Sequence, residues 1–130
     1  MWLAAHLRPL GLPLHCPDFN EPEFETITTS RMIRQVYDAI ACLPKGPVVL
    51  IGSSLGAFVA WHTAARQSLE TEARSPITRL VLLAPALDFG TNRRMGTVGI
   101  KQWRDDGHLD IFHHAFGEHR RVGYELYADA

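Results

Sequence analysis

The stretch PVVLIGSSLGAFVAWH, residues 47–62, decides how this sequence is expected to fold. Residues 48–51 form a short apolar run rich in β-branched side chains, bounded by Pro47 and Gly52, as is typical of a buried parallel strand. A Gly-x-Ser-x-Gly turn follows, and the apolar and small residues after it predict a helix packed closely on the sheet. This order of strand, turn and helix makes Ser54 the candidate reactive residue.

The Gly-x-Ser-x-Gly spacing has a steric reason. A serine at the tip of a strand-to-helix turn takes a strained backbone conformation, and Gly52 and Gly56 would let the flanking chain pass close by. A helix that starts at Ser54 aims its free N–H groups and its positive dipole end at negative charge beside the hydroxyl. We therefore predict Ser54 as a nucleophile and the backbone N–H of Leu55 as an oxyanion donor.

Two other interpretations of this turn are weaker. The first is an ordinary glycine-rich strand-to-helix turn in which the serine only caps the helix. The second is a phosphate-binding loop, which needs Gly-Lys-Ser/Thr after a four-residue gap, but no lysine follows Gly52 until Lys101.

The rest of the chain alternates helical and strand patterns. We expect a helix over residues 2–10, a short strand over 12–17, a helix capped by Thr29 or Ser30, and a second buried strand over 79–84. Both cysteines, Cys16 and Cys42, lie in apolar segments and are expected to be buried, reduced thiols. Helices that alternate with apolar strands predict an α/β fold with a mostly parallel sheet.

Composition sets limits on function. The 130 residues are 46% hydrophobic, enough for one modest core, so a single domain over residues 1–130 is expected. A formal net charge of -1 argues against nucleic-acid and acidic-membrane partners. No run of 18 apolar residues exists, and the first residues lack the pattern of a signal peptide, so a cytoplasmic protein is expected.

The pattern changes beyond Leu87. Residues 88–101 are rich in Gly, Arg and Asn and predict a loop, and residues 103–130 carry aromatic residues at roughly helical spacing. We interpret residues 88–130 as a lid-like loop with two short helices that fold over the sheet edge at which Ser54 is accessible.

Three segments together resemble the small bacterial serine esterases of the α/β-hydrolase superfamily: the elbow at 52–56, LHCPDF at 14–19 and LVLLAPA at 80–86. The resemblance covers about residues 2–130. It implies a three-layer sandwich and a Ser-His-Asp/Glu hydrolase of carboxylic esters or thioesters, with Ser54 as nucleophile, Leu55 as oxyanion donor, and no metal or organic cofactor. The implied partner is a small-molecule ester or thioester.

Two family motifs are absent from the sequence. The His-Gly turn should precede residue 2, and the late acid and the Gly-x-His segment should follow residue 130. The strand that carries the His-Gly turn lies in this superfamily between the strand resembling residues 12–17 and the elbow strand. We therefore expect a partial α/β-hydrolase fold, in which the chain is a fragment. The alternative function is a noncatalytic chain, either truncated or a binding module.

A compact triad within these residues is a further possibility. Asp88 follows a strand end and His108 lies in Asp-Asp-Gly-His, which matches the order serine, acid, histidine. Only about 20 residues separate the two, with no clear strand-helix-strand between them. The competing interpretation is that Asp88 is a turn residue and His108 a surface group.

The remaining charged and imidazole groups favour structural roles. The cluster His108, His113, His114 and His119 lacks the spacing of three or four that metal ligands on one helix face need, so helical, partly exposed histidines are expected. His62 lies about two helical turns beyond Ser54, too far along the axis to act as its base. Four basic residues could attract a substrate carboxylate, although a solvated loop is the favoured interpretation. They are Arg93, Arg94, Lys101 and Arg104.

Overall fold

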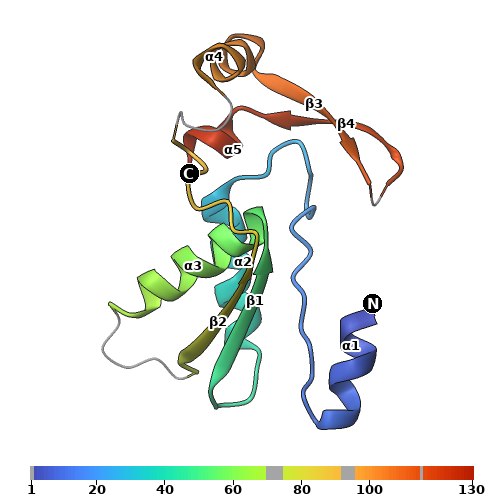
Figure 1. The fold of residues 1–130 in the computed structure, drawn as a ribbon, viewed down its shortest axis with the longest axis vertical. Helices are drawn as coiled ribbons and strands as arrows, with labels where there is room; N and C mark the ends of the chain where they lie inside the picture. Colours follow the sequence, from blue (N-terminus) through green and yellow to red (C-terminus); the bar gives the residue numbers. More distant parts are fainter. Residues whose placement is uncertain (1, 70–74, 92–95, 115) are drawn as a thin grey trace.

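A computed structural model describes residues 2–69, 75–91, 96–114 and 116–130 (Figure 1). The elements in chain order are α1 (Trp2–Leu7), η1 (Arg8–Leu10), α2 (Thr29–Ala41), β1 (Val48–Ser53), α3 (Leu55–Gln67), β2 (Ile77–Leu83), α4 (Gly96–Asp106), β3 (His108–His113), β4 (Glu118–Gly123) and α5 (Glu125–Ala128).

The first helix is confirmed, and the first strand is not. α1 continues into the 3-10 turn η1, which is capped by Gly11 in the left-handed conformation with φ 72°. Residues 12–17 were predicted as a strand but form no strand in the structure. A strand needs a hydrogen-bonded neighbour, and β1 pairs only with β2 within the described residues.

The second helix follows its sequence pattern. Its apolar positions recur at helical spacing and are buried: Met32, Ile33, Val36 and Ile40. The N-cap is Thr28, whose side chain accepts a hydrogen bond from the Arg31 N–H at 3.2 Å. The cap is therefore one residue earlier than the predicted Thr29 or Ser30, and Thr29 is the first residue of the helix.

β1 and β2 form a parallel pair, in which Ile51 is opposite Val81 and Ser53 is opposite Leu83. α3 packs against both strands, and α2 packs against α3 (Figure 1). Side chains that alternate along the two strands remain between 42% and 55% exposed: Val49, Ile51, Val81 and Leu83. The carboxyl ends of both strands meet at one edge, which is where Ser54 lies.

Residues 108–123 form an antiparallel hairpin, so the prediction of helix there is wrong. β3 pairs with β4, with Leu109 opposite Val122. The exposure alternates along β3, since Leu109 and Ile111 are half-buried whereas Asp110 and Phe112 are exposed. This period of two outweighs the aromatic spacing that indicated a helix. A helix precedes the hairpin, because α4 starts at Gly96, inside the loop predicted for residues 88–101.

One apolar core joins the two halves of the molecule. It includes Ile33 and Val36 from α2, Phe58 from α3, and residues of the C-terminal half, among them Trp103 and Val122. The indole N–H of Trp103 also donates to the carbonyl of Val122 at 3.1 Å, which fixes α4 on the hairpin.

Two cysteine predictions need correction. Cys16 and Cys42 are free, as expected, but both are exposed rather than buried. Cys16 lies in the extended segment that forms no strand, and Cys42 is the C-cap of α2, where the helix no longer covers it. Among the described residues, no helix has the length and apolarity needed to cross a bilayer.

Candidate active site

Ser54 lies between β1 and α3 in a strained conformation, with φ 52° and ψ -119°. Such a backbone costs on the order of 1–3 kcal/mol and persists only where its surroundings hold it. The Ser54 N–H donates to the Leu83 carbonyl at 2.9 Å. The Ser54 carbonyl accepts the N–H groups of Ala57, Phe58 and Ala86 at 3.1, 3.3 and 3.2 Å. Bonds from two neighbouring segments therefore hold the turn.

The two glycines of the turn have different roles. A Cβ on Gly52 would lie 2.3 Å from the carbonyl oxygen of Gly56, a distance that real side chains do not reach. A Cβ on Gly56 would meet nothing within 4 Å. The expectation that both positions need glycine for close approach is therefore correct for Gly52 and wrong for Gly56, whose backbone is the surface that Gly52 approaches.

The N-terminus of α3 offers free donors beside Ser54. The N–H of Leu55 has no backbone acceptor among the described residues, as the first N–H groups of a helix have no partner within the helix. The positive end of the α3 dipole points the same way. The Leu55 N–H is therefore available to an acceptor outside the helix.

Within the described part of the chain, the Ser54 side chain forms no hydrogen bond that would identify the acid or base of a triad. There, the Ser54 hydroxyl forms no hydrogen bond with a histidine. Nδ1 of His108 lies 3.0 Å from the carbonyl oxygen of Asp106. The carbonyl of Asp88 accepts the N–H and hydroxyl of Thr91 at 3.0 and 2.6 Å. Asp88 is thus in a turn, and the triad of Asp88 and His108 stays a prediction.

His62, which lies too far along α3 to act as the base for Ser54, packs on its own helix. Its ring lies 4.2 Å from the ring of Phe58, centroid to centroid. Burial lowers the pKa of His62, and the positive charge of Arg66 lowers it further. Both effects favour the neutral form of the imidazole.

The histidine cluster lies on the hairpin and not on a helix, which corrects the expectation. Nε2 of His113 lies 3.0 Å from Oδ1 of Asn20, and its ring contacts Phe24 edge-on at 4.7 Å. Phe112 contacts the rings of His114 and His119. Within the described residues, no three His, Cys, Asp or Glu side chains come close enough to hold a metal ion.

Two of the four predicted cations pair with one carboxylate on α4. Lys101 Nζ lies 2.7 Å and Arg104 Nε 3.8 Å from Asp105, and all three side chains are at least half exposed. The hydrogen bond from Lys101 is the main cause that lowers the pKa of Asp105. These two cations are on a solvated helix face. Arg93 and Arg94 lie outside the described residues.

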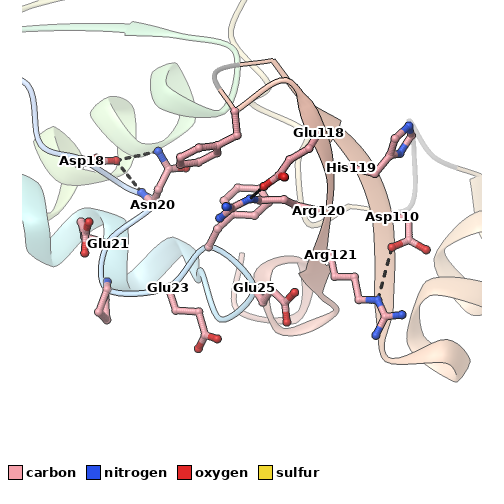
Figure 2. Close-up of a pocket in the computed structure, with 13 residues that line it drawn as sticks. Asp18, Asn20, Glu21, Glu23, Glu25, Asp110, Glu118, His119, Arg120 and Arg121 are labelled. Carbon is pink, nitrogen blue, oxygen red and sulfur yellow. Dashed lines mark hydrogen bonds and ion pairs between the residues drawn. The ribbon is translucent and has the colours of Figure 1, made fainter.

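A surface hollow of about 740 Å³ lies elsewhere, between residues 18–25 and the β3–β4 hairpin (Figure 2). Ser54 is not among the residues that line it. Carboxylates form much of its lining: Asp18, Glu21, Glu23, Glu25, Asp110 and Glu118. The sequence did not reveal this hollow, because the hairpin that forms one of its walls was not predicted.

The cations of the hollow are already paired. Arg120 Nε lies 2.8 Å from Glu118, and its guanidinium stacks 4.0 Å above the Phe116 ring. Arg121 Nε lies 3.6 Å from Asp110 (Figure 2). The lining therefore keeps an excess of negative charge on the side of residues 18–25.

Comparisons with known proteins agree with this fold. A family model described as the alpha/beta hydrolase family matches residues 1–129. A solved structure from Agrobacterium vitis S4, which carries a provisional hydrolase name, is similar with a TM-score of 0.60 and 21% identity. The match covers 78% of this chain and 40% of that one, so this chain spans less than half of its length. No protein of curated function matches significantly. The chain belongs to the alpha/beta hydrolase family.

Proposed function

We propose that this chain carries the nucleophile of a serine hydrolase that acts on carboxylic esters or thioesters. The observation that supports this most is the strained conformation of Ser54 at the carboxyl end of β1, beside the N–H of Leu55, which has no backbone acceptor among the described residues. A hydrolase is also what family membership favours.

The chemistry follows from this geometry. A general base removes the Ser54 proton, and the Ser54 oxygen attacks the carbonyl carbon of the substrate. The oxyanion that forms accepts the Leu55 N–H, aided by the dipole of α3. The alcohol or thiol then leaves with a proton, and water attacks the acyl-serine to release the acid and restore Ser54. Asp88 and His108 are the acid and base candidates within this sequence.

One observation favours a second candidate, a noncatalytic member that binds rather than cleaves. Within the described residues no histidine is hydrogen-bonded to the Ser54 hydroxyl, and without a base a serine hydroxyl is a weak nucleophile. In that case the Gly-x-Ser-x-Gly turn has only a structural role in the fold, and the chain acts as a binding module.

Labelling with a fluorophosphonate probe separates the two. We expect the probe to modify the wild-type chain and to fail on Ser54→Ala, because only an activated serine attacks phosphorus at a useful rate. The neighbouring exposed residue supplies the matched control, since Ser53→Ala removes a hydroxyl one position away and should leave labelling unchanged.

Two further outcomes complete the test. Labelling that is also lost in His108→Ala, in a chain that circular dichroism shows to be folded, would support the compact triad. A folded wild-type chain that takes no label would contradict the hydrolase proposal for this chain and favour the binding module.

A further inference from the structure

Asp129 joins parts of the chain that lie about 100 residues apart. Oγ1 of Thr29 lies 2.8 Å from both the carbonyl oxygen and Oδ2 of Asp129, so its one O–H is shared between these two acceptors. The Ser30 N–H donates to Oδ2, and the Ser30 hydroxyl donates to Oδ1 at 2.9 Å. Both partners lie in the first turn of α2, where a carboxylate also meets the positive end of the helix dipole.

The segment that Asp129 anchors packs against the loop after β2. Tyr127, which is 7% exposed, lies two residues before Asp129, and its ring contacts Phe89 edge-on at 5.6 Å. Phe89 in turn contacts Phe58 of α3 at 5.9 Å. Ala130 abuts Gly90 so closely that a Cβ on Gly90 would lie 2.8 Å from the Ala130 Cβ. Residues 84–90 are therefore confined from the side of α5.

The same loop holds the Ser54 turn. The Ala86 N–H donates to the Ser54 carbonyl at 3.2 Å, and Ala84 takes a positive φ of 42° just before it. A non-glycine residue in that region is strained and stays there only where its neighbours leave no alternative. The position of the Ser54 carbonyl thus depends on the shape of residues 84–90.

From these contacts we infer that Asp129 is a positioning residue for the Ser54 site. By fixing residues 127–130 on α2, it confines the loop 84–90 through Phe89 and Gly90, and the loop holds the strained Ser54 turn through Ala86. Asp129 does not touch the reacting atoms. The consequence for reactivity rests on the proposed function, whereas the consequence for the loop does not.

The hydrogen bonds to Asp129 lower its pKa, although its burial acts in the opposite direction. Burial acts to raise the pKa of Asp129, but the bonds from Ser30 and Thr29 and the charge of Arg66 bring it below its ordinary value. The carboxylate is therefore ionised at neutral pH and makes charge-assisted bonds, which are stronger than those between neutral groups.

The test is amide hydrogen exchange in the 130-residue chain, compared between wild type, Asp129→Ala and Ser30→Ala. In Asp129→Ala we expect exchange over residues 84–90 to accelerate by on the order of tenfold, because bonds to a charged acceptor are lost. Ser30→Ala, which keeps the carboxylate and removes one donor, should show a smaller change in the same segment. Exchange in β1 should stay unchanged in both.

Asp110→Ala is the matched control, because Asp110 is an exposed aspartate paired with Arg121 at 3.6 Å on the hairpin. It should leave residues 84–90 unaffected. The inference is overturned if Asp129→Ala leaves exchange in 84–90 at the wild-type rate. It is equally overturned if exchange accelerates to the same extent in β1, since that would show a general loss of stability.

The probe reaction supplies the functional arm. The second-order rate of fluorophosphonate labelling at Ser54 should fall in Asp129→Ala and be partly restored in Asp129→Asn, which keeps the size and one acceptor oxygen. An unchanged labelling rate in Asp129→Ala would overturn the link to Ser54. If the wild type takes no label, the proposed function fails, while the exchange measurement still decides the role of Asp129.

Discussion

At the scale of single residues, the elbow works because one position lacks a side chain. Gly52 is buried, and its Cα faces the backbone of Gly56 and Ala57 across the turn. This close approach lets α3 begin directly after Ser54. The glycine therefore sets the distance between strand and helix at the point where chemistry is proposed.

A glycine-to-alanine pair tests this directly. Gly52→Ala should lower the free energy of unfolding by about 2–3 kcal/mol, because the new Cβ would meet a backbone oxygen that cannot move away without displacing α3. Gly56→Ala is the matched control and should raise stability by about 0.5–1 kcal/mol, since its Cβ enters open space within a helix. Urea denaturation measures both. Equal effects of the two substitutions would contradict this interpretation of the turn.

At the scale of elements, α3 carries both the proposed oxyanion donor and a perturbed histidine. His62 and Arg66 are four residues apart and so share one face of the helix. The ring of His62 packs on Phe58, which also contacts the ring of Phe89 in the loop after β2. The neutral form of His62 thus belongs to the packing that supports the Ser54 turn.

The lowered pKa of His62 makes stability depend on pH. Because the folded-state pKa lies below the unfolded value of 6.5, the unfolded chain binds the proton more readily. The stabilising contribution of neutral His62 is complete above pH 6.5 and declines as the pH falls from there toward the folded-state pKa. We expect the free energy of unfolding to fall between pH 7.5 and 5.5 more steeply for the wild type than for His62→Gln. Parallel curves for the two proteins would refute the assignment.

At the scale of the whole molecule, one core joins the β1–β2 unit to the β3–β4 hairpin. Trp103, which is 3% exposed, lies in that core, contacts Tyr124 and Tyr127, and bonds to Val122. Among the described residues, no strand of one sheet pairs with a strand of the other. Side-chain packing is therefore what should make the described parts unfold together.

Two tryptophans allow a matched comparison of this point. Trp103→Ala should cost about 3–5 kcal/mol, as for other large aromatic side chains removed from a core. Trp61→Ala should cost much less, because Trp61 is 48% exposed on α3. Denaturation followed by far-ultraviolet circular dichroism checks both values. A small cost for Trp103→Ala would show that the hairpin half folds independently of the β1–β2 unit.

The sequence alone determined the local parts of this protein. The apolar run before Gly52, the Gly-x-Ser-x-Gly turn and the helical period of α2 predicted β1, α3, α2 and the strained Ser54, because each depends on neighbours within a few residues. β2 was predicted as a strand for the same reason, but the prediction that both strands are buried is wrong, because Val49, Ile51, Val81 and Leu83 are exposed. The resemblance to the α/β-hydrolase superfamily, which rested on residues 14–19, 52–56 and 80–86, is confirmed by the family match.

Only the tertiary structure decided the contacts between distant segments. Residues 12–17 have the composition of a strand but form none, since a strand depends on a neighbour that local sequence does not specify. Residues 108–123 have aromatic spacing that suggests a helix, yet pairing and packing on Trp103 make them a hairpin. The bond between Asp129 and the start of α2 spans about 100 residues. Such contacts depend on the path of the folded chain, and no periodicity in the sequence encodes that path.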